Sequence, residues 1–174
     1  MNGAGGRDWR ALLLGLATVA VLAYTAWLRF APRPWADPPA PGTTAPPRIL
    51  KMRGETAPRL LLDLRGHVAW IVFGPADADN IAALRRFEQS HPLFRLIVAT
   101  PEGAPETPDT NASFSDATRR SFGARDLPLH VLIDEEGRVL ATARGDGREG
   151  WERLLAAARE RLKQLEPVLP ERFA

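Results

Sequence analysis

The most informative absence in this 174-residue chain is cysteine, which does not occur at all. Without thiols the protein can form no disulfide, no thiolate metal site and no iron–sulfur cluster, and it cannot perform thiol-based redox chemistry. The absence leaves the cellular compartment open, because a chain without cysteine is equally stable in reducing and oxidising surroundings. The sequence also has no Gly-rich phosphate loop and no nucleophile elbow.

The chain also lacks long segments with charge of one sign. Its 23 basic and 21 acidic residues are interspersed and give a formal charge of +2. No basic stripe alternates with aromatic residues, so nucleic-acid binding is not expected. No small-molecule substrate site is evident either. The length and the 45% hydrophobic content fit one domain with appendages.

What the chain does have is one long apolar run near its start. The eighteen residues from Ala11 to Leu28 carry no charge, which is enough for a helix that spans a membrane. Trp9 and Trp27 are about 27 Å apart along such a helix, so each indole is expected at one membrane interface. A cleaved signal peptide is the alternative, but its apolar region is normally shorter. We predict an uncleaved anchor over residues 11–30, after a tail of residues 1–10.

A proline-rich segment follows the apolar run. Seven of the seventeen residues from Ala31 to Pro47 are proline, which excludes a helix or a central strand and favours a stiff, extended spacer. We predict a linker over residues 31–48 that holds the domain up to about 50 Å from the bilayer. Trp35 is a candidate docking residue, because an exposed indole can bury a large area against a partner.

Alternating strand and helix patterns fill residues 49–166, before a tail of residues 167–174. Continuous apolar runs predict buried strands, and apolar residues at helical spacing predict helices. The predicted elements are strands at 67–73 and 94–100, helices at 79–90 and 115–123, a loop at 101–113, a hairpin at 127–145 and a closing helix at 148–165. This order predicts an α/β domain with a mixed sheet flanked by helices.

The stretch SFGARDLPLHVLIDEEGRVLATARG resembles the thioredoxin-like domains of membrane-anchored bacterial thioredoxins of the TlpA and cytochrome-c-biogenesis type. In that family an aromatic-Gly-small segment leads to a cis-proline, a strand ending in Ile-Asp, a Gly turn and a last strand ending in Gly. The matching residues here are Phe122, Gly123, Pro128, Ile133, Asp134, Gly137 and Gly145. The resemblance covers residues 56–164 and implies a thioredoxin-like fold with Pro128 as the cis-proline. It also implies a single-pass protein of the bacterial inner membrane with a periplasmic domain.

Members of this family carry a C-x-x-C motif at the start of their first long helix. Counting from the preceding strand aligns the two cysteines with Ala78 and Ile81, so both redox positions are degenerate. The helix N-terminus lowers the pKa of a thiol at the first position, whereas alanine has nothing to ionise. Asp77 and Asp79 instead supply carboxylates, which stabilise a helix start by about 1 kcal/mol. We therefore predict a redox-inactive member of the family that is not an enzyme.

The histidines offer only weak candidates for other chemistry. His130 follows the expected cis-proline and, with Asp77 and Asp79, gives a weak candidate for a metal site. We favour a strand histidine beside a capped helix, because capping already explains both carboxylates. His67 and His91 are each isolated in sequence and are expected at the surface. No catalytic residue, metal or cofactor is predicted.

Two functions remain open at this point. The first is a non-catalytic, membrane-anchored accessory or structural subunit that docks on and stabilises a multisubunit respiratory or photosynthetic membrane complex. The second is a periplasmic assembly factor or chaperone, which holds an extended peptide or a metallochaperone client in the cis-proline groove by strand pairing. The expected partners are membrane lipid and an integral membrane protein complex.

Overall fold

The computed structural model describes residues 5–30, 34–55, 57, 59–105 and 107–166. The chain divides into two compact units, Met1–Pro34 and Trp35–Ala174. The tail expected at residues 167–174 lies outside the described residues, as do residues 1–4 and 31–33. Each unit is therefore described by itself.

Within the described residues, the first unit contains helix α1, Gly5–Phe30, which has 26 residues. The helix starts inside the stretch that we expected as a tail. Its large apolar side chains are exposed, including Trp9 at 55% and Trp27 at 63%. The ring of Trp27 stacks with that of Tyr24 at a centroid distance of 6.2 Å. Among the described residues, no helix combines the length and the hydropathy that crossing a membrane requires.

The second unit is built on a mixed seven-stranded sheet with the order β2-β1-β5-β4-β3-β6-β7. Its strands are β1 (Ile49–Met52), β2 (Arg59–Leu60), β3 (Val68–Phe73), β4 (Phe94–Pro101), β5 (Ala112–Phe114), β6 (Leu129–Ile133) and β7 (Val139–Arg144). Strand β3 pairs in parallel with β4 and antiparallel with β6. All six residues of β3 are buried, as the continuous apolar run predicts.

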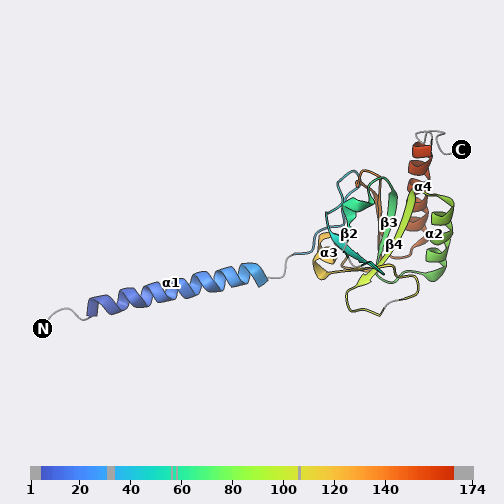
Figure 1. Cartoon of the computed structure of the whole chain (residues 1–174). Helices are drawn as coiled ribbons and strands as arrows, with labels where there is room; N and C mark the ends of the chain where they lie inside the picture. The colour runs from blue at the N-terminus through green and yellow to red at the C-terminus, as the bar shows by residue number, and fades with distance from the viewer. Residues whose placement is uncertain (1–4, 31–33, 56, 58, 106, 167–174) are drawn as a thin grey trace. The chain divides into compact units, whose positions relative to one another are not determined.

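Helices cover both faces of this sheet. Figure 1 shows α2 (Ala78–Ser90) and α4 (Arg148–Leu165) on one side, and α3 (Asp116–Ser121) on the other. The short 3₁₀ helix η1 covers Leu61–Leu64. On the α2/α4 side the core contains Trp70, Leu84 and Leu154. On the other side Phe73 packs against Phe122, with ring centroids 4.9 Å apart, because successive strand residues face opposite sides.

The prediction of a loop over residues 101–113 was wrong for the last two residues, which belong to a strand. The structure has strand β5 at Ala112–Phe114, where it pairs with β4 and with β1. The hairpin of β1 and β2, which precedes β3, was not predicted either. Strands of two to four residues are too short to show a period in sequence, so these elements depend on their neighbours in the sheet.

Side chains replace a missing strand along the first half of β4. Strand β5 pairs with β4 only from Ala99 onward. Before that point the Leu96 N–H donates to Glu88 Oε1 over 3.0 Å, and the Val98 N–H donates to Asn111 Oδ1 over 2.8 Å. The Asn111 side-chain amide in turn donates to Leu96 O over 2.9 Å. These bonds satisfy backbone groups that would otherwise lack partners at a sheet edge.

Residues 35–45 of the proline-rich segment, which we call the strap, belong to the second unit and pack against the rest of it. The Ala36 N–H donates to Arg120 O over 3.0 Å, and the Gly42 N–H donates to Val139 O over 2.7 Å. The Val139 N–H donates back to Thr43 O over 2.8 Å. The expected role of residues 31–48 as an extended spacer is therefore wrong for the strap. Proline content stiffens a chain, but it leaves the non-proline amides able to pair.

Candidate functional site

The start of α2 is the first candidate, because a thioredoxin-like enzyme would carry its dithiol there. The Asp77 side chain accepts a hydrogen bond from the Asn80 N–H over 3.0 Å, so Asp77 caps the helix. Gly74, at the turn between β3 and α2, has φ = 94°. A Cβ at Gly74 would lie 2.8 Å from Leu127 Cβ. Glycine therefore allows this turn to approach the segment before Pro128 closely.

The two positions aligned with the thiols have different environments. The Ala78 side chain is exposed, whereas Ile81 is 2% exposed and packs in the core between the sheet and α2. Neither side chain ionises or exchanges electrons. This end of α2 can present backbone amides and the Asp77 and Asp79 carboxylates to a partner, but it cannot attack a disulfide.

The segment before β6 completes this end of the unit. The Leu127–Pro128 peptide bond is cis, which is the isomer that the resemblance implies. The Pro128 carbonyl accepts a hydrogen bond from the Gly145 N–H over 2.8 Å. Within the described part of the chain, the backbone N–H and carbonyl of Leu127 form no hydrogen bond. Unpaired backbone groups of this kind can form hydrogen bonds with an extended chain.

His130 lies in a buried polar group that sequence reasoning missed. The Trp70 Nε1–H donates to His130 Nδ1 over 3.3 Å, and His130 Nε2 is 3.3 Å from Asp146 Oδ1. Edge-on contacts join the His130 ring to the rings of Trp70 and Trp151, with centroids 6.2 and 5.9 Å away. No sequence signal links these residues, because they come from β3, β6, the loop after β7 and α4.

Burial determines the electrostatics of this group. His130 is only 1% exposed, and burial lowers its pKa from the ordinary 6.5, with the Asp146 carboxylate opposing the change. The Trp70 N–H occupies Nδ1, so the neutral imidazole carries its proton on Nε2, which faces Asp146. The metal cluster considered for His130 with Asp77 and Asp79 gains no support. Among the described residues, no three His, Asp or Glu side chains are arranged to hold a metal ion.

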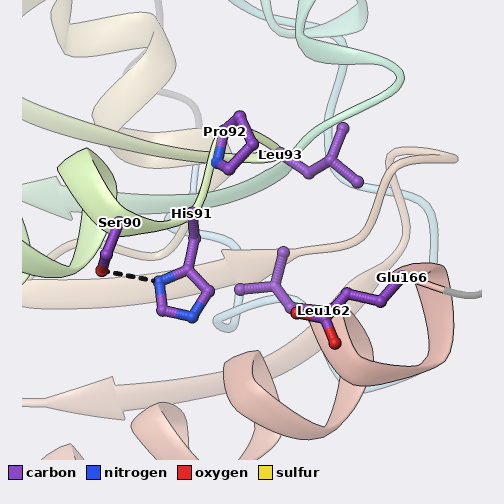
Figure 2. Close-up of a pocket in the computed structure, with 6 residues that line it drawn as sticks. All are labelled: Ser90, His91, Pro92, Leu93, Leu162 and Glu166. Carbon is purple, nitrogen blue, oxygen red and sulfur yellow. Dashed lines mark hydrogen bonds between the residues drawn. The ribbon is translucent and has the colours of Figure 1, made fainter. Parts of the chain in front are cut away.

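A second candidate surface lies at the far end of α2. It is a pocket of about 180 Å³. Figure 2 shows the residues that line it, which are Ser90, His91, Pro92, Leu93, Leu162 and Glu166. The His91 ring stacks on Phe87 with centroids 4.0 Å apart, so His91 is half-buried rather than fully at the surface. The pocket is about 18 Å from the start of α2, given thirteen helical residues.

The side chains of this pocket do not form a catalytic arrangement. Ser90 Oγ is 3.0 Å from His91 Nδ1, but it is equally close to Phe87 O. His91 Nδ1 is itself 2.9 Å from Phe87 O. Both groups thus bond to carbonyls at the helix end, which is the usual behaviour of polar residues there. Within the described structure no hydrogen bond joins Glu166 to His91.

Comparison with known proteins identifies the fold. No family model matches the chain, and no curated protein matches it in sequence. Solved structures do match. A protein described as thiol:disulfide interchange protein DsbE from Chlorobium tepidum superposes with a TM-score of 0.58 at 20% identity, over 71% of this chain and 99% of that chain.

Two further structures agree with the first. A thiol peroxidase from Chromobacterium violaceum gives a TM-score of 0.55 at 19% identity, over 76% of this chain and 93% of its own. The thioredoxin domain of a thiol-disulfide oxidoreductase from Bacteroides vulgatus gives 0.52 at 14% identity, over 67% and 96%. Identities this low establish the fold alone. The chain therefore contains a domain with the thioredoxin-like fold.

Proposed function

We propose that this protein is a non-catalytic, membrane-anchored accessory subunit that docks on and stabilises a multisubunit respiratory or photosynthetic complex. One observation carries the proposal. The domain has a capped helix start and a cis-proline segment, but the positions that the family resemblance assigns to the thiols hold Ala78 and the buried Ile81. Thiol–disulfide exchange requires a thiolate, and the chain has no cysteine. A scaffold without its nucleophile is suited to binding rather than to redox chemistry.

The anchor in this proposal is inferred from the sequence. The uncharged run from Ala11 to Leu28 has eighteen residues, and the apolar side chains along α1 are exposed, as lipid contact requires. By the resemblance, the proposed location is the bacterial inner membrane with the domain on the periplasmic side. Trp9 and Trp27 are the proposed interface residues, and membrane lipid is the proposed partner of α1.

Trp35 remains the proposed contact with the partner complex. It is half-buried in the strap, so part of the indole is accessible to another protein. Because the strap is bonded to the domain, the indole is held in place before a partner arrives. A held aromatic side chain loses less conformational entropy on binding than a mobile one.

A second candidate function is favoured by Leu127. Its unpartnered backbone N–H and carbonyl, next to the cis bond, suit strand pairing with an extended peptide. In this candidate the protein is a periplasmic assembly factor that holds a client peptide or a metallochaperone at the cis-proline groove.

Affinity purification of the tagged full-length chain after mild detergent extraction tests the first proposal. We expect an integral membrane complex to co-purify in a fixed ratio, with Trp35→Ala weakening the association at least tenfold. Phe114→Leu, which changes only the core, serves as the control for folding. Absence of any membrane complex would contradict the proposal. Capture of unfolded or extended peptides by protein free of such a complex would favour the second candidate instead.

A further inference from the structure

A polar pocket of about 240 Å³ lies between the strap and the segment that leads to Pro128. Strap residues 35–37 form one wall, Gly123, Arg125 and Asp126 form another, and Arg144 at the end of β7 completes it. The walls are mostly polar, so the pocket does not suit an apolar ligand. Its volume is several times the roughly 30 Å³ that one water takes up in the liquid.

Positive charge gathers at this strap pocket. The guanidinium carbons of Arg119, Arg120 and Arg125 lie 5.2, 5.7 and 5.8 Å from the centre of the Trp35 ring. The negative face of the indole ring attracts each of these cations. The Trp35 ring therefore holds three cations close together, and Arg144 adds a fourth.

The carboxylates that line the pocket do not balance this charge. Those carboxylates belong to Asp37 and Asp126. The lining has two arginines, Arg125 and Arg144, which equal the carboxylates in number. The excess positive charge comes from Arg119, which lies against the Trp35 ring and donates to two backbone carbonyls. Within the described part of the chain, neither the Arg125 nor the Arg144 side chain forms an ion pair or a hydrogen bond. Their N–H groups are available to a ligand.

The chemistry of these groups selects the class of ligand. A guanidinium donates two parallel N–H bonds to an oxyanion, and the match is good for phosphate. Two such groups, on Arg125 and Arg144, can take up different oxygens of one phosphate. The carboxylates of Asp37 and Asp126 oppose a bound anion, so the affinity depends on the excess of arginine.

We propose that the strap pocket binds a phosphate group. The source is either free phosphate or the headgroup of an anionic lipid. The lipid source rests on the proposed function, in which α1 lies in the membrane. Trp35 follows the last residue of α1, Phe30, by five positions, which span at most about 18 Å. An anchor in the bilayer therefore keeps the pocket within reach of lipid headgroups.

The proposal is tested by calorimetric titration of the full-length chain in an uncharged detergent and a phosphate-free buffer. One arm uses inorganic phosphate. The other uses phosphatidylglycerol in mixed micelles, with micelles of the detergent alone as the blank. The double variant Arg125→Gln/Arg144→Gln should bind phosphate at least tenfold more weakly. Its control is Arg65→Gln/Arg86→Gln, which removes the same charge from two exposed arginines outside the pocket and should stay within twofold of the parent.

A third variant gives an effect of the opposite sign. Asp126→Asn removes one repulsive carboxylate and should tighten phosphate binding about threefold. If the parent chain binds phosphatidylglycerol and Arg125→Gln/Arg144→Gln does not, the site binds a lipid headgroup. Binding of inorganic phosphate without phosphatidylglycerol assigns it to free phosphate. The proposal is overturned if neither probe binds, or if the pocket and control variants lose affinity equally.

A second measurement, alkaline extraction of membranes, separates this proposal from the proposed function. Phosphate binding in detergent does not depend on the location of α1, whereas alkaline extraction of membranes reports directly whether the chain is anchored. Suppose that alkali releases the chain from membranes, but that the chain binds inorganic phosphate through Arg125 and Arg144. This result would contradict the proposed anchor and support the phosphate site.

Discussion

The indole N–H of Trp70 donates to Nδ1 of His130 in the interior of the domain. This bond fixes the neutral tautomer of the imidazole, with the Nε2 proton facing Asp146. Protonation of Nδ1 would place two N–H groups against each other in a buried site, so the folded domain resists it. The pKa of His130 is accordingly lowered from 6.5.

The first prediction is that acid destabilises the domain through His130. The unfolded chain has an ordinary histidine pKa near 6.5, whereas the folded pKa lies below it. The stabilisation is therefore complete above about pH 6.5 and is lost as the pH falls toward the folded value. Urea unfolding between pH 7.5 and 5.5 should show the free energy of unfolding falling with acidification, with a smaller slope in His130→Gln.

His67 provides the control for this measurement. Burial and the charge of Arg95 also lower its pKa, so His67 contributes with the same sign, but it is more exposed. We expect His67→Gln to retain most of the slope. Equal slopes in the parent and in His130→Gln would show that the Trp70–His130 pair does not resist protonation.

The second prediction concerns the close contact between the strap and Gly123. This residue has φ = 62°, and a Cβ there would lie 2.6 Å from Pro38 N and closer still to Ala36 O. Gly123→Ala should release the strap and destabilise the domain by more than the roughly 1–2 kcal/mol that a left-handed backbone costs. Hydrogen exchange should show loss of protection at the Ala36 amide.

Gly103→Ala is the matched control for the strap. Gly103 has φ = 81°, and a Cβ added there would have no neighbouring atom within 4 Å, so its substitution incurs only the backbone cost. If both variants lost the same stability and Ala36 stayed protected in each, the close contact between strap and Gly123 would have no energetic role.

The third prediction concerns the side chain that substitutes for a strand beside β4. Asn111→Ala leaves the Val98 N–H without its acceptor, which should cost about 1–3 kcal/mol of unfolding free energy. Leu96 O keeps a second donor in Arg85, so the loss should come mainly from the Val98 amide. Asn80→Ala, whose side chain forms no such bond in the described structure, should change stability by less than about 0.5 kcal/mol. Similar losses in both variants would contradict the assignment.

The fourth prediction tests the electrostatics of the α2 start. Because the chain has no cysteine, Ala78→Cys introduces a single thiol at a helix N-terminus, where the amides favour the thiolate. Its pKa should lie below that of the single thiol in Gln89→Cys, near the end of the same helix. The pH dependence of alkylation measures both values. The reverse order would mean that the Asp77 and Asp79 charges outweigh the helix.

The sequence predicted the elements whose signal lies within their own residues. Strand β3 is a continuous apolar run, and α4 repeats apolar residues at helical spacing, so each carries its own pattern. The hairpin of β1 and β2 and strand β5 have no such pattern, because they are too short and gain their stability from pairing. The strap was missed for a related reason, since its hydrogen bonds go to residues 84 to 97 positions away.

The residues of the candidate site also differ in whether short sequence patterns could predict them. The cis bond before Pro128 followed from the family resemblance, and the assignment of Ala78 and Ile81 to the thiol positions depends on the same resemblance. The contact of His130 with Asp146 and the arginines around Trp35 did not, because elements that are distant in sequence bring those residues together. Such contacts depend on the tertiary fold and leave no short motif in the chain.

The pairing of the strap with β7 has a consequence for producing the domain on its own. β7 is the last strand of the sheet, and the strap occupies its outer edge at Val139. A fragment that starts at Ile49, the first residue of β1, would leave those backbone groups unpaired, and open sheet edges recruit other chains. Such a fragment should aggregate during refolding, whereas one that retains Trp35 onward should remain monodisperse in light scattering.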